Sequence, residues 1–231
     1  MEENKKNIFL PLSILIGAVL ISGALIYNAG IKSFGGDKDI PNEQQSGDPE
    51  KMAEITSADY VRGNRNASVK LVVFEDLECP FCKQFHETLA EVSREYGDKV
   101  AIVWRHFPLD IHPKAAKEAE AAECVGELGG NDKFWAFIDK IFEITPSNNG
   151  LDLAELSKTA VILEIDKAKF ETCLNSNKYS KKIQDAVENA IASGGTGTPY
   201  SIIIGKDGKK NPVSGALPFA QIKIIIEESL R

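Results

Sequence analysis

Cysteine and histidine are scarce in this sequence, with four and three copies among 231 residues. So few cysteines exclude a small fold stapled by many disulfides. Basic side chains are in the minority, with 27 Lys and Arg against 34 Asp and Glu, and the formal net charge is -7. Such an acidic chain repels phosphate backbones, so nucleic-acid binding is not expected. Internal repeats are absent.

What is present suits a globular protein, because 43% of the residues are hydrophobic and 26% are charged. That balance supports a hydrophobic core and excludes wholly disordered and collagen-like chains. The length allows one domain of ordinary size with some additional chain.

The additional chain lies at the N-terminus, where residues 8–27 contain no charged side chain. Twenty apolar residues in a helix match the hydrocarbon thickness of a bilayer, so we expect a transmembrane signal anchor after a short cytoplasmic tail, residues 1–7. Ser22 and Ala24 leave a cleaved signal peptide as the alternative. Lysines flank the span equally and do not decide its orientation. Residues 28–55 are polar and rich in Gly and Pro, which predicts a flexible linker.

The folded domain is expected over residues 56–231, in an α/β class. Residues 70–74 and 100–104 are short β-branched runs typical of buried strands, and the stripe of apolar residues between Cys79 and Tyr96 predicts a helix. Together they form a βαβ unit.

A helical insertion is expected over about residues 112–193, because this block shows helical periodicity and no strand signal. Its expected helices are 112–128, 134–144, 151–163, 166–174 and 179–192. A strand at 200–204, a turn at 206–209, a short strand near Val213 and a helix at 218–230 complete the domain.

The motif Cys79-Pro80-Phe81-Cys82 opens the first helix directly after a buried strand. The free N–H groups of a helix N-terminus stabilise an anion, so the Cys79 thiol is expected to have a lowered pKa. Pro80 suits the first turn, and Cys82 lies within disulfide reach. This context favours redox chemistry over half of a zinc site or a purely structural disulfide.

Thr198-Pro199 follows a glycine-rich stretch and precedes the strand at 200–204. From the sequence alone an ordinary trans peptide bond is favoured here, because only about 5–6% of X–Pro bonds are cis.

With this combination of motifs the chain resembles the DsbA-like thiol-disulfide oxidoreductases of the thioredoxin superfamily. The resemblance runs from about residue 59 to the C-terminus. It implies a thioredoxin-like fold, with Pro199 as a cis-proline beside the active site and Thr198 as a substrate-binding residue. It also implies that Cys79 is the exchanging sulfur and that Cys82 resolves the mixed disulfide, supported by Pro80 and Phe81.

One position departs from the family. The buried acid that often lies six residues before the first cysteine is replaced by Val73. Glu75, Asp76 and Glu78 are nearby, but a short acidic turn is expected to be solvated. His86 is expected to be an exposed surface residue, and Trp104 and Trp135 are expected to be core residues.

The remaining cysteines, Cys124 and Cys173, both lie in the expected insertion. Outside the cytoplasm they would form a structural disulfide, and two buried free thiols are the alternative.

The sequence therefore predicts a monomeric, single-pass cell-membrane protein whose extracytoplasmic domain oxidises thiols of secreted proteins, with no cofactor and no metal. The resemblance implies a reoxidising partner, a quinone-linked membrane oxidase of the DsbB or VKOR type. A reductase or isomerase on the same fold is one alternative. A tethered binding or chaperone module, with a structural or zinc-holding CxxC, is another.

Overall fold

The structure, a computed structural model, describes residues 47–231. The expected tail and transmembrane segment, and most of the expected linker, lie outside this range. Within the range, each helix is too short or too polar to cross a lipid bilayer.

A mixed five-stranded sheet forms the centre of the domain. Its order is β1-β3-β2-β4-β5, and only the β2–β3 pair is parallel. The strands are β1 (Tyr60–Arg62), β2 (Val69–Glu75), β3 (Val100–His106), β4 (Tyr200–Ile204) and β5 (Lys210–Ser214). The expected βαβ unit is confirmed, with each of its strands longer than the apolar run that predicted it.

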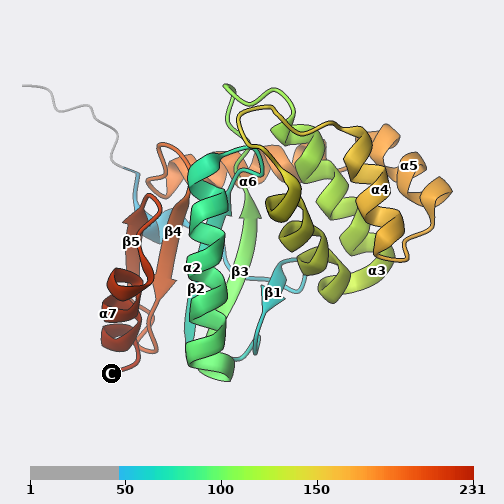
Figure 1. The fold of residues 1–231 in the computed structure, drawn as a ribbon. Coiled ribbons are helices and arrows are strands. Elements are labelled where there is room, and N and C mark those ends of the chain that lie inside the picture. Colours follow the sequence, from blue (N-terminus) through green and yellow to red (C-terminus); the bar gives the residue numbers. More distant parts are fainter. Residues whose placement is uncertain (1–46) are drawn as a thin grey trace, which may run out of the picture. The chain divides into compact units, whose positions relative to one another are not determined.

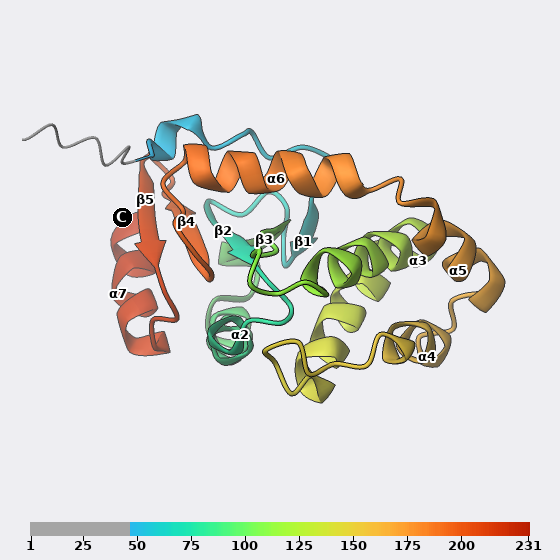
Figure 2. The same cartoon turned by 90° about the horizontal axis from the view of Figure 1, so that it is seen from above.

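Helices cover both faces of the sheet (Figures 1 and 2). Helices α2 (Pro80–Tyr96) and α7 (Phe219–Ser229) lie on one face, and α6 (Ser180–Ala192) lies on the other. The apolar stripe of α2 is buried through Phe85, Leu89 and Val92, all 0% exposed. Burial of each such side chain contributes roughly 1.5–3 kcal/mol, which fixes α2 and the residues at its N-terminus against the sheet.

The expected helical insertion is confirmed between β3 and β4. It contains α3 (Ala115–Ile144), α4 (Ala154–Ile162), α5 (Lys167–Ser176) and α6. The expected helices at 112–128 and 134–144 correspond to the two halves of α3, which meet at a kink where Gly130 has a non-helical φ of 80°. Figure 2 shows α3, α4 and α5 beside the β1 edge of the sheet.

Strand β1 was not predicted, because three residues are too few to show a strand pattern. Tyr60 in this strand stacks on Phe134 of α3 with ring centroids 3.7 Å apart. Gly126 of α3 permits this approach, since an added Cβ would lie 2.1 Å from the Tyr60 hydroxyl oxygen. The edge strand thereby joins the insertion to the sheet.

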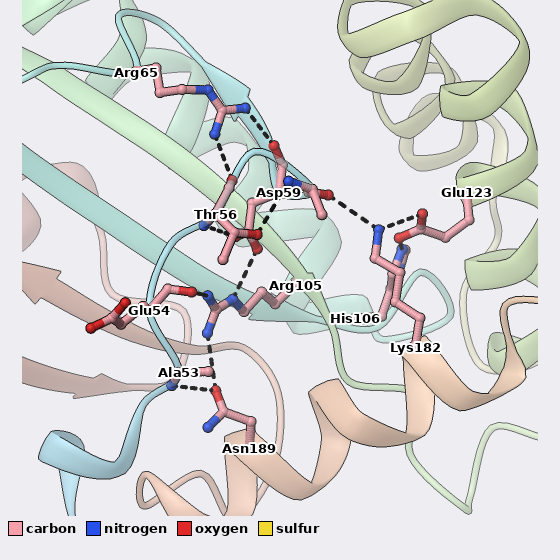
Figure 3. Close-up of polar contacts among 11 residues, drawn as sticks. Ala53, Glu54, Thr56, Asp59, Arg65, Arg105, His106, Glu123, Lys182 and Asn189 are labelled. Carbon is pink, nitrogen blue, oxygen red and sulfur yellow. Dashed lines mark hydrogen bonds and ion pairs between the residues drawn. The ribbon is translucent and has the colours of Figure 1, made fainter.

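The prediction of a flexible linker is wrong for its last residues. Residues 49–51 form a short 3-10 helix, η1 (Pro49–Lys51), and Met52 is buried in the core beneath α6. The Asn189 side chain of α6 accepts the N–H of Ala53 at 3.1 Å and donates to the carbonyl of Lys51 at 2.9 Å. Arg105 of β3 also donates to Asn189 at 3.0 Å (Figure 3). These contacts are non-local, so the local composition did not reveal them.

Replacing Asn189 with alanine should release this segment. Three side-chain hydrogen bonds are lost, and we expect the free energy of unfolding to fall by about 1–3 kcal/mol. Hydrogen exchange at residues 48–58 should accelerate before the rest of the domain is affected. Gln184→Ala on the same helix removes only an exposed hydrogen bond to Glu188 and serves as the control. Equal hydrogen-exchange protection of residues 48–58 in both variants would show that Asn189 does not hold this segment on the domain.

Candidate active site

Cys79 is the N-cap residue of α2, and Pro80 occupies the first helical position. The Cys79 thiol donates to the backbone carbonyl of Thr198 at 3.5 Å. Its pKa is lowered to about 6. A hydrogen bond from Cys82 is the largest cause, burial acts in the opposite direction, and the Thr198 side chain and the backbone N–H groups of Cys82 and Phe81 add to the lowering. The lowered pKa agrees with the expectation from the sequence, but the Cys82 thiol contributes more to it than the N–H groups of the helix N-terminus.

Cys82 has the opposite environment. It is 0% exposed, and its sulfur accepts the backbone N–H of Asp76 at 3.4 Å. Burial raises the pKa of Cys82 well above its usual value, and the hydrogen bond to Cys79 and the charge of Glu75 act in the same direction. Both thiols are free in this structure. The pair thus combines a stabilised thiolate with a proton-holding thiol.

The structure brings Thr198 and Pro199 to this pair, with a cis peptide bond between them. The backbone carbonyl of Pro199 accepts the N–H of Gly215 at 2.9 Å, which joins it to the loop after β5. Phe81 is 60% exposed beside the buried Cys79. The two cysteines and the Thr198-Pro199 segment therefore form one cluster, as the resemblance implied, and the apolar side chain of Phe81 lies at its surface.

The acidic turn before Cys79 is buried, so its expected solvation is wrong. Asp76 and Glu78 are 1% and 0% exposed. Asp76 accepts hydrogen bonds from the N–H of Leu109 and from His112, both at 2.8 Å. Glu78 lies against Glu118, whose pKa is raised to about 9 by burial and by this neighbour. The insertion covers the turn, which a local sequence pattern cannot indicate.

Glu75 at the end of β2 is a buried acid near the cysteine pair, where a solvated side chain was expected. It is 1% exposed, its two carboxyl oxygens have no hydrogen-bond partner among the described residues, and it lies close enough to Cys82 for each group to shift the pKa of the other. Burial raises its pKa well above the usual value. Glu75 lies two residues after Val73 and so on the same strand face. Side chains alternate between the two faces of a strand, so extending the predicted strand by one residue beyond Phe74 would have placed Glu75 on the face that α2 covers.

His86 is not the exposed residue that was expected. Its side chain is 12% exposed, and Nε2 lies 2.7 Å from Oδ1 of Asp139 on α3. Arg62 of β1 contacts the same carboxylate oxygen at 2.6 Å. His86 therefore joins α2 to the insertion through this polar network.

The second cysteine pair forms the expected disulfide. Cys124 of α3 and Cys173 of α5 are bonded, with their Cα atoms 5.9 Å apart. No group of three or more His, Cys, Asp or Glu side chains suited to a metal ion occurs among residues 47–231.

A family model described as Thioredoxin matches residues 56–228. The chain belongs to the thioredoxin family. Among solved structures, DsbA2 of Pseudomonas aeruginosa is 29% identical with a TM-score of 0.63, covering 77% of this chain and 100% of that one. Wolbachia pipientis alpha-DsbA1 is 23% identical with a TM-score of 0.66, covering 78% and 94%. This thioredoxin family member therefore has the fold of DsbA-type thiol-disulfide oxidoreductases.

A curated relative carries a different name. A protein of Mycolicibacterium gilvum named Na(+)/H(+) antiporter NhaA 1 is 32% identical over 151 residues, which cover 64% of this chain. The match covers 24% of that protein, so the chain spans about a quarter of the length of such relatives. The similarity therefore concerns one part of the antiporter, and its transport activity is not transferred to this thioredoxin family member.

The lowered Cys79 pKa predicts a change in how the reduction potential of the pair depends on pH. Above pH 6 only Cys82 takes up a proton on reduction, and the potential should change by about 30 mV per pH unit. Below pH 6 both sulfurs take up protons, and the slope should approach about 60 mV per unit. Potentials measured from pH 4.5 to 8 test this, with the exposed Glu87→Gln variant as a control. A single slope of about 60 mV over the whole range would contradict the expectation.

Proposed function

We propose that this protein is a thiol-disulfide oxidase that introduces disulfide bonds into proteins through Cys79 and Cys82. The observation that supports this proposal is the difference in pKa between the two sulfurs: the pKa of Cys79 is lowered, which favours a thiolate, and the pKa of the buried Cys82 is raised, which favours a thiol. A low thiol pKa makes Cys79 a good leaving group, which favours release of oxidised substrate.

The reaction would proceed in two exchanges. A substrate thiolate attacks Sγ of Cys79, the Cys79–Cys82 bond breaks, and Cys82 leaves and takes up a proton. A second substrate thiolate then attacks the substrate sulfur of the mixed disulfide, and Cys79 leaves as a thiolate. The substrate gains one disulfide, and the active-site pair gains two electrons.

Glu75 is suited to supply the proton to Cys82. It lies close to this thiol in a buried site, and its raised pKa keeps a proton available. Glu75 would then take up a proton from solvent, and on reoxidation the Cys82 proton would leave through the same carboxyl group, so above pH 6 reduction of the pair takes up one proton overall. Glu75, two residues closer to Cys79 than Val73 is, would thus take the place of the buried acid that the family often has at the position of Val73.

Substrate binding would use Thr198 and Pro199, whose backbone lies beside the Cys79 sulfur. An extended peptide can pair with such a backbone segment, and sequence-independent hydrogen bonds suit many substrates. Phe81 and Pro80 would present an apolar surface to the same peptide.

The proposed setting is the outer side of a cell membrane, with residues 8–27 as a single-pass anchor and the domain as a monomer. The Cys124–Cys173 disulfide supports this setting, because structural disulfides persist in oxidising compartments. Secreted proteins would be the substrates, and a quinone-linked oxidase of the DsbB or VKOR type would reoxidise the pair.

The reduction potential of the Cys79–Cys82 pair in the full chain tests the proposed direction. Equilibration with glutathione, trapping of thiols and mass spectrometry of the Cys79–Cys82 peptide would measure it separately from the second disulfide. A value near about −120 mV, as for DsbA, would support an oxidase. A value near about −270 mV, as for thioredoxin, would identify a reductase instead.

A further inference from the structure

Residues 47–59, here called the strap, are packed on the domain beside α6 (Figure 2). Met52 anchors the strap, because it is 5% exposed and belongs to the same core cluster as Tyr200 of β4. Arg105 of β3 holds the strap farther along, since its guanidinium donates to the carbonyl of Glu54 at 2.9 Å (Figure 3). The strap is therefore fixed to the domain by a buried side chain and by hydrogen bonds to its backbone.

The first two residues of the strap contact the chain at the end of α6. The backbone N–H of Asp48 donates to the carbonyl of Ala192, the last residue of α6, at 2.9 Å. Gly47 lies so close to Gly194 that an added Cβ would be 2.2 Å from the backbone nitrogen and 2.4 Å from the Cα atom of Gly194. The two backbones are thus in direct contact, and glycine is the residue that allows this approach.

The loop that this contact supports carries the segment beside the active-site cysteines. Residues 193–199 connect α6 to β4. The start of the loop is also held by the Tyr200 hydroxyl, which donates to the carbonyl of Ser193 at 2.6 Å. Its end is held by the N–H of Gly215, which donates to the carbonyl of Pro199 at 2.9 Å. The loop is therefore fixed at both ends, and the strap contacts the first of them.

The middle of the loop has less support. Within the described part of the chain, no hydrogen bond is found from the backbone N–H groups of residues 196–198. The carbonyl of Thr198 accepts the Cys79 thiol at 3.5 Å, which is a long contact. The place of Thr198 relative to Cys79 therefore depends on where the two ends of the loop are held.

We propose that Gly47 is a positioning residue: through its contact with Gly194, the strap sets the place of the Thr198-Pro199 segment beside the Cys79 sulfur. The inference rests on the proposed function, because it concerns the peptide-binding segment of that site. The chain that leads to the proposed membrane anchor would thus enter the domain at the base of its substrate-binding loop.

An alanine at position 47 would disturb this contact without changing any group that reacts. The atoms that its Cβ would meet belong to the backbone of Gly194, so rotation of a side chain cannot relieve the overlap. The separation must increase from 2.2 Å to at least 3.4 Å, where ordinary contact begins. Either the strap or the loop has to move, and in both cases the loop loses its support from the strap.

Gly47→Ala in the full chain tests the proposal, with Ala53→Ser as the matched control, because this change adds one atom at an exposed position of the same strap. Hydrogen exchange at residues 193–199 should accelerate in Gly47→Ala and not in the control. The Cys79 pKa should rise from about 6 toward its usual value, since Thr198 is one of the groups that lower it. The pH dependence of Cys79 alkylation in the reduced protein measures this pKa. Neither readout depends on whether the protein oxidises or reduces its substrates.

The binding of substrate is measured by the KM for a peptide in thiol-disulfide exchange. In Gly47→Ala this KM should rise about fivefold, the effect of losing one hydrogen bond to the peptide, and it should not change in Ala53→Ser. Asn189→Ala releases the strap at Lys51 and Ala53 and should reproduce the changes at the loop and in KM. It therefore serves as a second variant if Gly47→Ala does not fold.

Three results would overturn the proposal. They are unchanged loop exchange and an unchanged Cys79 pKa in Gly47→Ala, an unchanged KM despite faster loop exchange, and an unchanged loop in an Asn189→Ala variant whose strap is released. Failure of the proposed oxidase function would show instead in the reduction potential of the Cys79–Cys82 pair.

Discussion

Replacement of Cys79 by serine is expected to reduce disulfide exchange to the uncatalysed background. The thiolate is the reacting species, and a serine hydroxyl neither ionises near neutral pH nor forms a disulfide. The loss should be complete because Cys82, 0% exposed, cannot receive a substrate thiolate in its place. Oxidation of a reduced model protein, followed by its recovered activity, measures the effect.

Cys82→Ser is the informative counterpart. This variant keeps the Cys79 thiolate but lacks the resolving thiol, so a mixed disulfide with an added substrate should accumulate. Mass spectrometry would locate that bond at Cys79. Retained exchange in Cys79→Ser, or a mixed disulfide at another cysteine, would disprove the assigned roles of the two sulfurs.

The second large effect is expected from removal of the Cys124–Cys173 disulfide. These residues are 49 positions apart, and the loop entropy of such a cross-link corresponds to a stabilisation of about 4 kcal/mol. The bond joins α3 to α5, so its loss also loosens the packing of the insertion. For a domain of this size we expect the melting temperature of Cys124→Ala/Cys173→Ala to fall by roughly 8–16 °C.

Thermal unfolding followed by circular dichroism measures this shift. The control is Cys79→Ala/Cys82→Ala, which also removes two buried sulfurs but leaves the cross-link intact. A similar decrease in both double variants would show that lost packing, and not the cross-link, determines the stability. The reduction potential of Cys79 and Cys82 in the Cys124→Ala/Cys173→Ala variant shows whether the insertion also tunes the active site.

The regular elements followed from local patterns. Strand β4 begins and ends at the expected residues, Tyr200 and Ile204, because an apolar run after a proline defines both limits. Helix α2 begins one residue after Cys79, where the Cys-Pro sequence placed it. The hairpin turn at 206–209 contains Gly208 with a φ of 83°, as the Asp-Gly pair indicated. These features depend on neighbours in the sequence.

The predictions that failed concern features that depend on contacts between residues far apart in the sequence. Met52 belongs to a polar segment, yet it is buried because α6 supplies the surface beneath it. Asp76 and Glu78 resemble a solvated turn, yet the insertion covers them. Trp104 was correctly assigned to the core, but its indole N–H proved to have a specific acceptor in His106.

The sequence by itself determined the chemistry of this protein, a cysteine pair at a helix N-terminus beside a buried strand, with a Thr-Pro segment and a helical insertion. Helix periodicity, proline position and N-terminal dipoles are local properties, and a sequence encodes them directly. Only the tertiary structure decided which groups surround the cysteines. Glu75 lies near Cys82 because it continues the strand face on which α2 packs, and it is the register partner of His106 because β2 pairs with β3. Burial and charge pairing arise from such long-range contacts, which a local stretch of sequence does not encode.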